Sequence, residues 1–124
     1  MELKLCESEY CFMSIIWDNE PLASGDLVKL CNRELGWKKS TTYTLLKRMT
    51  ERGFAKNEDY TVTSCVPREE VQRFASESFV EKTFSGSLPS FLVAFFDGKR
   101  ISDSEAEELK RLIDEYKSED SEIK

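Results

Sequence analysis

The sequence predicts a mostly α-helical protein with one small β-hairpin, and three observations support this. Apolar residues recur at intervals of three and four along most of the chain, which is the spacing of amphipathic helices. Residues 54–66 are instead rich in Thr, Val and Tyr around a polar turn, as a hairpin is. The composition, with 40% hydrophobic and 34% charged residues among 124, suits a helical protein with solvated faces.

Two helices are expected first, over residues 7–17 and 23–35. In each, apolar side chains recur on one face and turn-forming residues end the pattern. The segment DNEP at 18–21 separates them, because Pro21 disfavours a helical conformation in the residue before it. Gly36 follows the second helix where a backbone of positive φ is expected.

The third helix, over residues 39–52, has an apolar face of Leu45, Leu46 and Met49, with Thr42 beside them. Its opposite face carries short hydroxyls and cations instead of the mixed acids and bases of an ordinary solvated helix. We therefore expect this helix to pack on a core through one side and to meet a partner through the other.

The hairpin is predicted to pair residues 54–56 with 60–66 around a turn at 57–59. Three helices followed by a hairpin is the order of elements in a winged helix-turn-helix domain, which we place at residues 1–67. Residues 68–124 are expected to form a separate region of three helices.

The three C-terminal helices are expected at residues 68–84, 88–97 and from 102 onward, where SDSE is a capping box. The middle helix is apolar nearly all round and is expected to be buried on most sides. The polar tail, 117–124, is expected to fray.

The apolar surface of this half favours a symmetric dimer, and the alternative is that these helices fold back onto the first domain as one monomeric core. The residues expected in the dimer contact are Phe79, Leu88, Phe91, Leu92, Phe95, Phe96, Leu109, Leu112 and Ile113.

The charge distribution favours DNA as the partner of the third helix. The chain carries a net charge of −6, yet residues 38–56 hold six bases against a single acid, Glu51. Most of the acidity belongs to residues 67–124, and a local basic face is sufficient to attract phosphates at physiological salt. In a helix-turn-helix the second helix of the pair enters the major groove, where hydroxyls read base edges and cations bind phosphates. The expected DNA contacts are Lys38, Lys39, Ser40, Thr41, Tyr43, Thr44, Lys47 and Arg48 on the helix and Lys56 in the wing.

Several other classes of function are disfavoured by the composition. The chain has no His, and its four Cys are scattered without a CxxC pair, so neither an enzyme nor a metal or cofactor site is expected. The N-terminus has no apolar run typical of a signal peptide, and no segment approaches 18 apolar residues. We expect a cytoplasmic protein without a membrane span.

The ordered set of motifs resembles the penicillinase-repressor family of bacterial winged-helix regulators. Glu9, Met13 and Trp17 are similar to the family's E-x-x-x-M-x-x-x-W pattern in the first helix. The stretches WKKSTTYTLLKRMTERGF, SGSLPSFLVAF and ISDSEAEELKRLIDE are similar to three further family motifs. Together these motifs extend the resemblance from about Leu5 to Tyr116.

The resemblance implies a homodimer that binds palindromic operator DNA and represses transcription, with dimerisation through the C-terminal helices. In the antibiotic-responsive branch, a sensor-activated protease releases the DNA, and the cleavage region corresponds to Ser87 and Leu88 here. The chain ends without the Cys-rich tail of the copper-responsive branch, so metal sensing is not expected. The wing is short and carries Glu58 and Asp59, which leaves open a second hypothesis, a winged-helix module that binds proteins instead of DNA.

Overall fold

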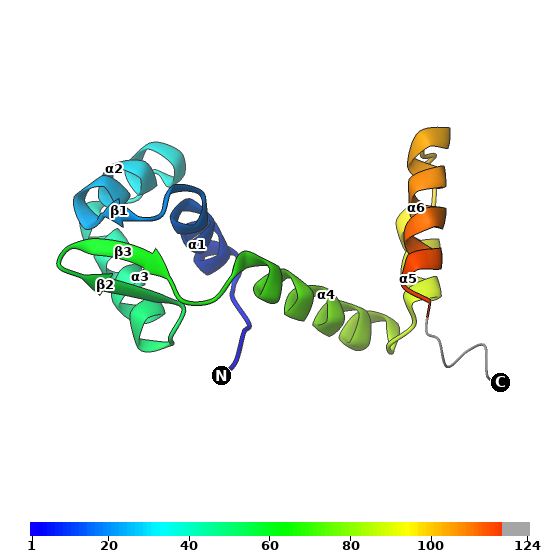
Figure 1. Ribbon diagram of the computed structural model, residues 1–124, viewed down its shortest axis with the longest axis horizontal. Helices are drawn as coiled ribbons and strands as arrows, with labels where there is room; N and C mark the ends of the chain where they lie inside the picture. Colours follow the sequence, from blue (N-terminus) through cyan, green and yellow to red (C-terminus); the bar gives the residue numbers. More distant parts are fainter. Residues whose placement is uncertain (118–124) are drawn as a thin grey trace. The chain divides into compact units, whose positions relative to one another are not determined.

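The computed structural model describes residues 1–117, and it contains two compact units, Met1–Gly86 and a second that begins at Ser87 (Figure 1). The prediction of a mostly helical protein with a small antiparallel sheet is confirmed. In chain order the elements of the first unit are α1 (Glu7–Asn19), β1 (Leu22–Ala23), α2 (Ser24–Leu35), α3 (Lys39–Glu51), β2 (Ala55–Glu58), β3 (Thr61–Ser64) and α4 (Arg68–Phe84). The second unit contains α5 (Leu88–Phe96) and α6 (Asp103–Glu115).

The sheet has one strand more than the sequence predicted. Strand β1 pairs antiparallel with β3 through Leu22 and Val62, so the strand order is β1-β3-β2. The backbone N–H of Ser24 donates to the carbonyl of Tyr60 at 2.8 Å and extends this pairing. A two-residue strand has too few positions for an alternating pattern, and for this reason β1 was not predicted.

The turn of the hairpin also differs from its predicted place at 57–59. Glu58 pairs with Thr61, so the turn consists of Asp59 and Tyr60 alone. Both residues have positive φ, at 52° and 64°, which is the backbone of a tight two-residue hairpin. Because neither is Gly or Asn, which usually mark such a turn, the sequence signal placed the turn too early.

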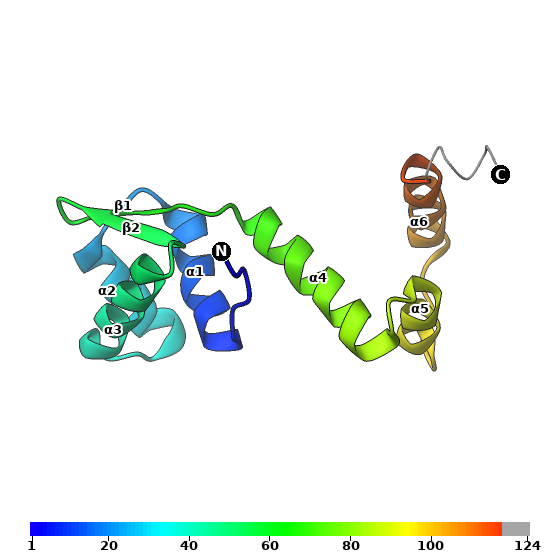
Figure 2. The same cartoon turned by 90° about the horizontal axis from the view of Figure 1, so that it is seen from below.

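Helices α1, α2 and α3 and the sheet enclose one apolar core (Figure 2). The apolar face that was predicted for α3 is buried, and Gly36 has the positive φ, 70°, that was expected after α2. This arrangement is the winged helix-turn-helix, and it leaves the second side of α3 open to solvent. The largest fully buried side chains are Phe12, Phe54, Met13, Ile16, Leu27, Met49, Val62, Thr42 and Cys31.

Helices α4, α5 and α6 contribute almost no buried side chains. In α4 only Val71 is buried, and neither α5 nor α6 has a buried residue. The expectation that α5 is buried on most sides is therefore wrong for the single chain, because its own unit supplies too little cover. Of the capping box predicted for α6, the structure shows one of the two bonds, in which the Ser102 hydroxyl accepts from the Glu105 N–H at 3.1 Å. Of the tail that was expected to fray, residues 118–124 lie outside the described residues.

Candidate nucleic-acid interface

Helix α3 turns every predicted contact residue outward. Its inner face holds Thr42, Leu45, Leu46 and Met49, all buried, so the rotation of the helix about its axis is set by the core. The exposed residues include all those predicted to contact DNA on this helix, namely Lys38, Lys39, Ser40, Thr41, Tyr43, Thr44, Lys47 and Arg48.

The first half of α3 has a polar outer face, and the side-chain contacts on that face lie within the helix itself. Lys39 lies with its Nζ 6.0 Å from the centre of the Tyr43 ring, and Tyr43 is 38% exposed. The Thr44 hydroxyl donates to the Ser40 carbonyl at 2.9 Å, so its oxygen remains an acceptor only. Lys38 occupies the N-cap position of α3, and its side chain cannot accept a hydrogen bond from the N–H groups of the first turn.

One edge of α3 is joined to α1 by an ion cluster that the sequence analysis did not find. Glu9 on α1 accepts from Arg48 Nη1 at 3.4 Å and from Arg52 Nη1 at 3.1 Å. Its side chain is only 10% exposed, whereas that of Arg48 is 48% exposed. The sequence placed Glu9 within a family motif but gave no sign of its partners, because these lie 39 and 43 positions further along the chain.

The environment of Glu9 favours its charged form. Burial raises the pKa of the carboxyl, but the hydrogen bonds from Cys6 and the charge of Arg52 together more than offset this effect. The pKa of Glu9 therefore lies below its usual value, and the carboxylate is charged at neutral pH.

The other edge of α3 faces the wing across a hollow of about 300 Å³. Along β2, Asn57 pairs with the buried Val62 and lines this hollow, whereas Lys56 belongs to the opposite face of the strand. Asn57 is thus a polar residue beside the predicted interface that sequence reasoning missed, since the register of the hairpin was misplaced. The full lining is Tyr43, Leu46, Lys47, Thr50, Glu51 and Asn57.

The predicted wing contact, Lys56, already has a partner within the wing. Its Nζ lies 3.1 Å from Glu58 Oε1, and both side chains are exposed. The hydrogen bond to Glu58 and the charge of that carboxylate raise the pKa of Lys56. The structure therefore does not group Lys56 with the cations of α3, and a surface pair of this kind contributes little to stability.

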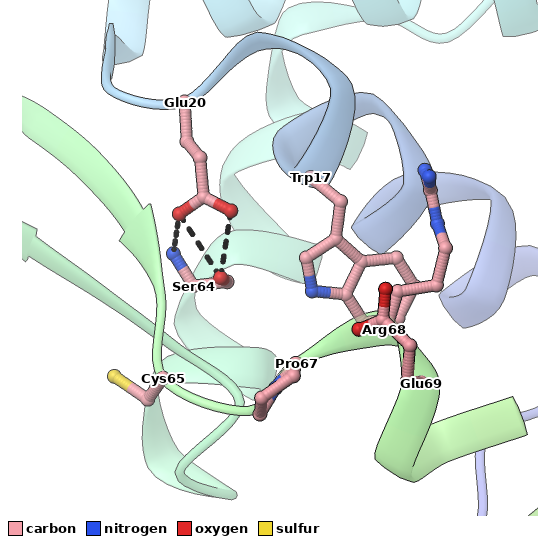
Figure 3. Close-up of a pocket in the computed structure, with 7 residues that line it drawn as sticks. All are labelled: Trp17, Glu20, Ser64, Cys65, Pro67, Arg68 and Glu69. Atoms are coloured by element: carbon pink, nitrogen blue, oxygen red, sulfur yellow. Dashed lines mark hydrogen bonds between the residues drawn. The ribbon is translucent and has the colours of Figure 1, made fainter. Parts of the chain in front are cut away.

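A second hollow, of about 350 Å³, lies between the base of the wing and the start of α4 (Figure 3). In it the Glu20 carboxylate accepts from the Ser64 N–H at 2.8 Å and from the Ser64 hydroxyl. The Arg68 guanidinium lies 5.3 Å from the centre of the Trp17 ring and is paired with Asp18 at 2.6 Å. These contacts connect the end of β3 and the start of α4 to α1, so they fix the wing's base relative to the core.

A family model described as penicillinase repressor matches residues 5–115. The chain belongs to the penicillinase repressor family. It is therefore a transcriptional repressor of the winged-helix kind and not an enzyme. Membership of a repressor family also agrees with DNA as the partner of the exposed face of α3.

Individual relatives share the family but have diverged widely in sequence. The methicillin resistance regulatory protein MecI of Staphylococcus aureus is 24% identical over 114 residues, which cover 89% of this chain and 93% of the relative. The penicillinase repressor of Bacillus licheniformis is 21% identical over 119 residues, which cover 93% of each chain. A solved structure of the multiple antibiotic-resistance repressor MarR from Listeria monocytogenes aligns with a TM-score of 0.49 at 15% identity, covering 91% of this chain and 73% of that one.

Neither a metal-binding cluster nor a membrane-spanning helix is found in the part of the chain that the structure describes. Among residues 1–117, no group of three or more Cys, Asp or Glu side chains is placed to hold a metal ion. Within the same range, none of the helices combines the length and apolar character required to cross a membrane.

Proposed function

We propose that this repressor acts in the cytoplasm as a homodimer and binds a palindromic operator in double-stranded DNA through α3. The observation that carries the proposal is the composition of one helix face. The inner side of α3 is anchored in the core, and its outer side presents hydroxyls, one aromatic ring and cations. A helix that follows another after a short turn, with that face outward, has the geometry that enters the major groove.

We assign Ser40, Tyr43 and Thr44 to the edges of bases. The Thr44 hydroxyl is committed as a donor within the helix, so its oxygen can accept from an amino group of adenine or cytosine. Its methyl group can contact the methyl group of thymine. These residues, with Thr41, would determine which sequence is bound.

We assign the cations of α3 to backbone phosphates. Lys38 and Lys39 lie at the N-terminus of the helix, where the helix dipole and the first-turn N–H groups also favour an anion. Lys47 is exposed and has no ion pair among residues 1–117. Arg48 is shared with Glu9, and Lys56 is paired with Glu58, so we expect Lys56 to contribute least.

The dimer is proposed to form through the region 68–124, while residues 1–67 bind DNA. Leu88, Phe95 and Ile113 are each more than half exposed, as is Phe79 on α4. An apolar surface of this kind, with no buried residue in α5 or α6, favours cover by a second copy. Two copies would present two α3 helices to two half-sites.

We also propose that a sensor-activated protease releases the DNA by cutting near Ser87 and Leu88. The division between the two compact units lies at Gly86 and Ser87, and Ser85 and Gly86 both have positive φ. Leu88 is 55% exposed at the start of α5. Cleavage here would separate the DNA-binding unit from most of the proposed dimer contact.

The experiment that tests the proposal is selection of bound sequences from a pool of random duplex DNA by the full chain. We expect a palindrome whose half-sites are about one helical turn apart. If the chain retains no duplex at low salt and instead recovers a protein partner, the alternative of a protein-binding module is favoured. The pairing of the wing cation Lys56 with Glu58 is also compatible with that alternative.

A further inference from the structure

Glu9 is a buried acid that lies against the helix proposed to bind DNA. Its Oε1 accepts from the Cys6 N–H at 3.0 Å and from Arg52 at 3.1 Å, and its Oε2 accepts from Arg48 at 3.4 Å. The first of these bonds belongs to the N-terminal cap of α1, so the carboxylate is fixed to the body of the domain. One of the proposed phosphate-binding cations is therefore held by an acid of its own chain.

The two arginines are held unequally. Arg52 also donates to the Lys4 carbonyl, and its guanidinium lies 4.9 Å from the centre of the Phe54 ring. The side chain of Arg48 makes no other hydrogen bond or ion pair among the described residues, and its bond to Glu9 is the longest of the three. With 48% of its side chain exposed, Arg48 is the partner that can leave Glu9.

We propose that Glu9 is a positioning residue that restrains Arg48 in the free protein and releases it to a DNA phosphate on binding. This inference rests on the proposed function, since it requires α3 to bind DNA. When Arg48 leaves, Glu9 keeps the Cys6 N–H and Arg52, so no unpaired charge is left buried. The Arg48 guanidinium makes a single hydrogen bond to Glu9, whereas a phosphate can accept two parallel hydrogen bonds from it.

The consequence is a lower affinity for DNA of any sequence than the cations of α3 alone would give. Each binding event must first separate Arg48 from Glu9, and a partly exposed ion pair opposes this modestly. A role of Glu9 in stability alone would give the opposite result, because loosening α1 against α3 would weaken DNA binding.

The test is a double-mutant cycle on a random-sequence duplex, measured at one salt concentration with variants whose helical content matches the parent. Glu9→Gln keeps an oxygen for the Cys6 N–H but removes the charge, and we expect it to bind about 2- to 5-fold more tightly than the parent. In an Arg48→Gln background the same change should give no such gain. The matched control is Glu7→Gln, which removes an equal charge from an exposed side chain in the same turn of α1.

Three outcomes would contradict the inference. In the first, Glu9→Gln binds the duplex no more tightly than Glu7→Gln does. In the second, Glu9→Gln increases the affinity equally in the Arg48→Gln background. Either result overturns the role of Glu9 and leaves the proposed function intact. If neither the parent nor any variant binds the duplex at low salt, the proposed function and the inference fail together.

A measurement on the unaltered protein covers the case in which Glu9→Gln does not fold. The carboxyl carbon resonance of Glu9 should shift when the same random-sequence duplex is added, because one of its two arginine partners leaves. A resonance that does not move while the duplex is bound would overturn the inference.

Discussion

Phe95 offers the simplest test of the proposed dimer contact. It lies on α5 and is 51% exposed, although its ring also contacts Phe91 and Phe96 within the same helix. Phe95→Ala removes this ring and leaves the backbone of the helix with a residue of higher helix propensity. Any loss of association should therefore come from the missing side chain.

The expected loss of dimerisation free energy follows from the exposed fraction of the Phe95 side chain. Full burial of a Phe side chain contributes about 2 to 3 kcal/mol, so covering the exposed half contributes about 1 kcal/mol per copy. A symmetric contact contains the substitution twice, which gives about 2 kcal/mol per dimer. The dimer dissociation constant should accordingly rise about 30-fold.

Sedimentation of the parent and variants over a range of concentrations measures this constant directly. Val93→Ala is the matched control, because Val93 is 73% exposed on the same helix but lies two positions away, on its opposite side. We expect Val93→Ala to leave the dissociation constant nearly unchanged. If both substitutions weaken association alike, or if Phe95→Ala has no effect, the assignment of this face to the dimer contact is wrong.

Two further predictions concern charge. Lys47→Gln should weaken binding to all duplexes alike. Each lost phosphate contact makes the dependence of log affinity on log salt shallower by about 0.9, so a dimer that carries the substitution twice should lose about 1.8 of slope. Lys110→Gln on α6 should not change this slope, and fluorescence anisotropy against salt measures both. Because the pKa of Glu9 is lower in the folded than in the unfolded chain, its contribution to stability is present above the usual Glu range and is lost as pH falls through the folded value. Urea unfolding of the parent at decreasing pH should therefore show a steeper loss than that of Glu9→Gln, and equal pH dependence would refute the assignment.

Local sequence signals were sufficient to predict the helices and the outward face of α3. The bounds of α3 differ from prediction by one residue, because a strong apolar period and Gly53 mark them. Its inner and outer faces follow from the same period. The wing was located less well, since the positive φ of Tyr60 depends on hairpin pairing and has no glycine signal.

Contacts between distant segments could not be predicted in the same way. The ion pairs of Glu9 join α1 to residues 39 and 43 positions away, and they depend on how the core sets the two helices side by side. The exposure of α5 was also not predicted, because an apolar composition does not indicate whether the residues that bury a helix belong to the same chain or to a second copy.

Parallel selections from random duplex DNA with the parent and with Thr44→Val test whether two copies of α3 read the two halves of an operator. We expect the parent to enrich a palindrome and the variant to change the preferred base at one position, symmetrically in both half-sites, because two copies of α3 read the two halves. Enrichment of the same sequence by both proteins, or of a sequence without two-fold symmetry, would contradict it.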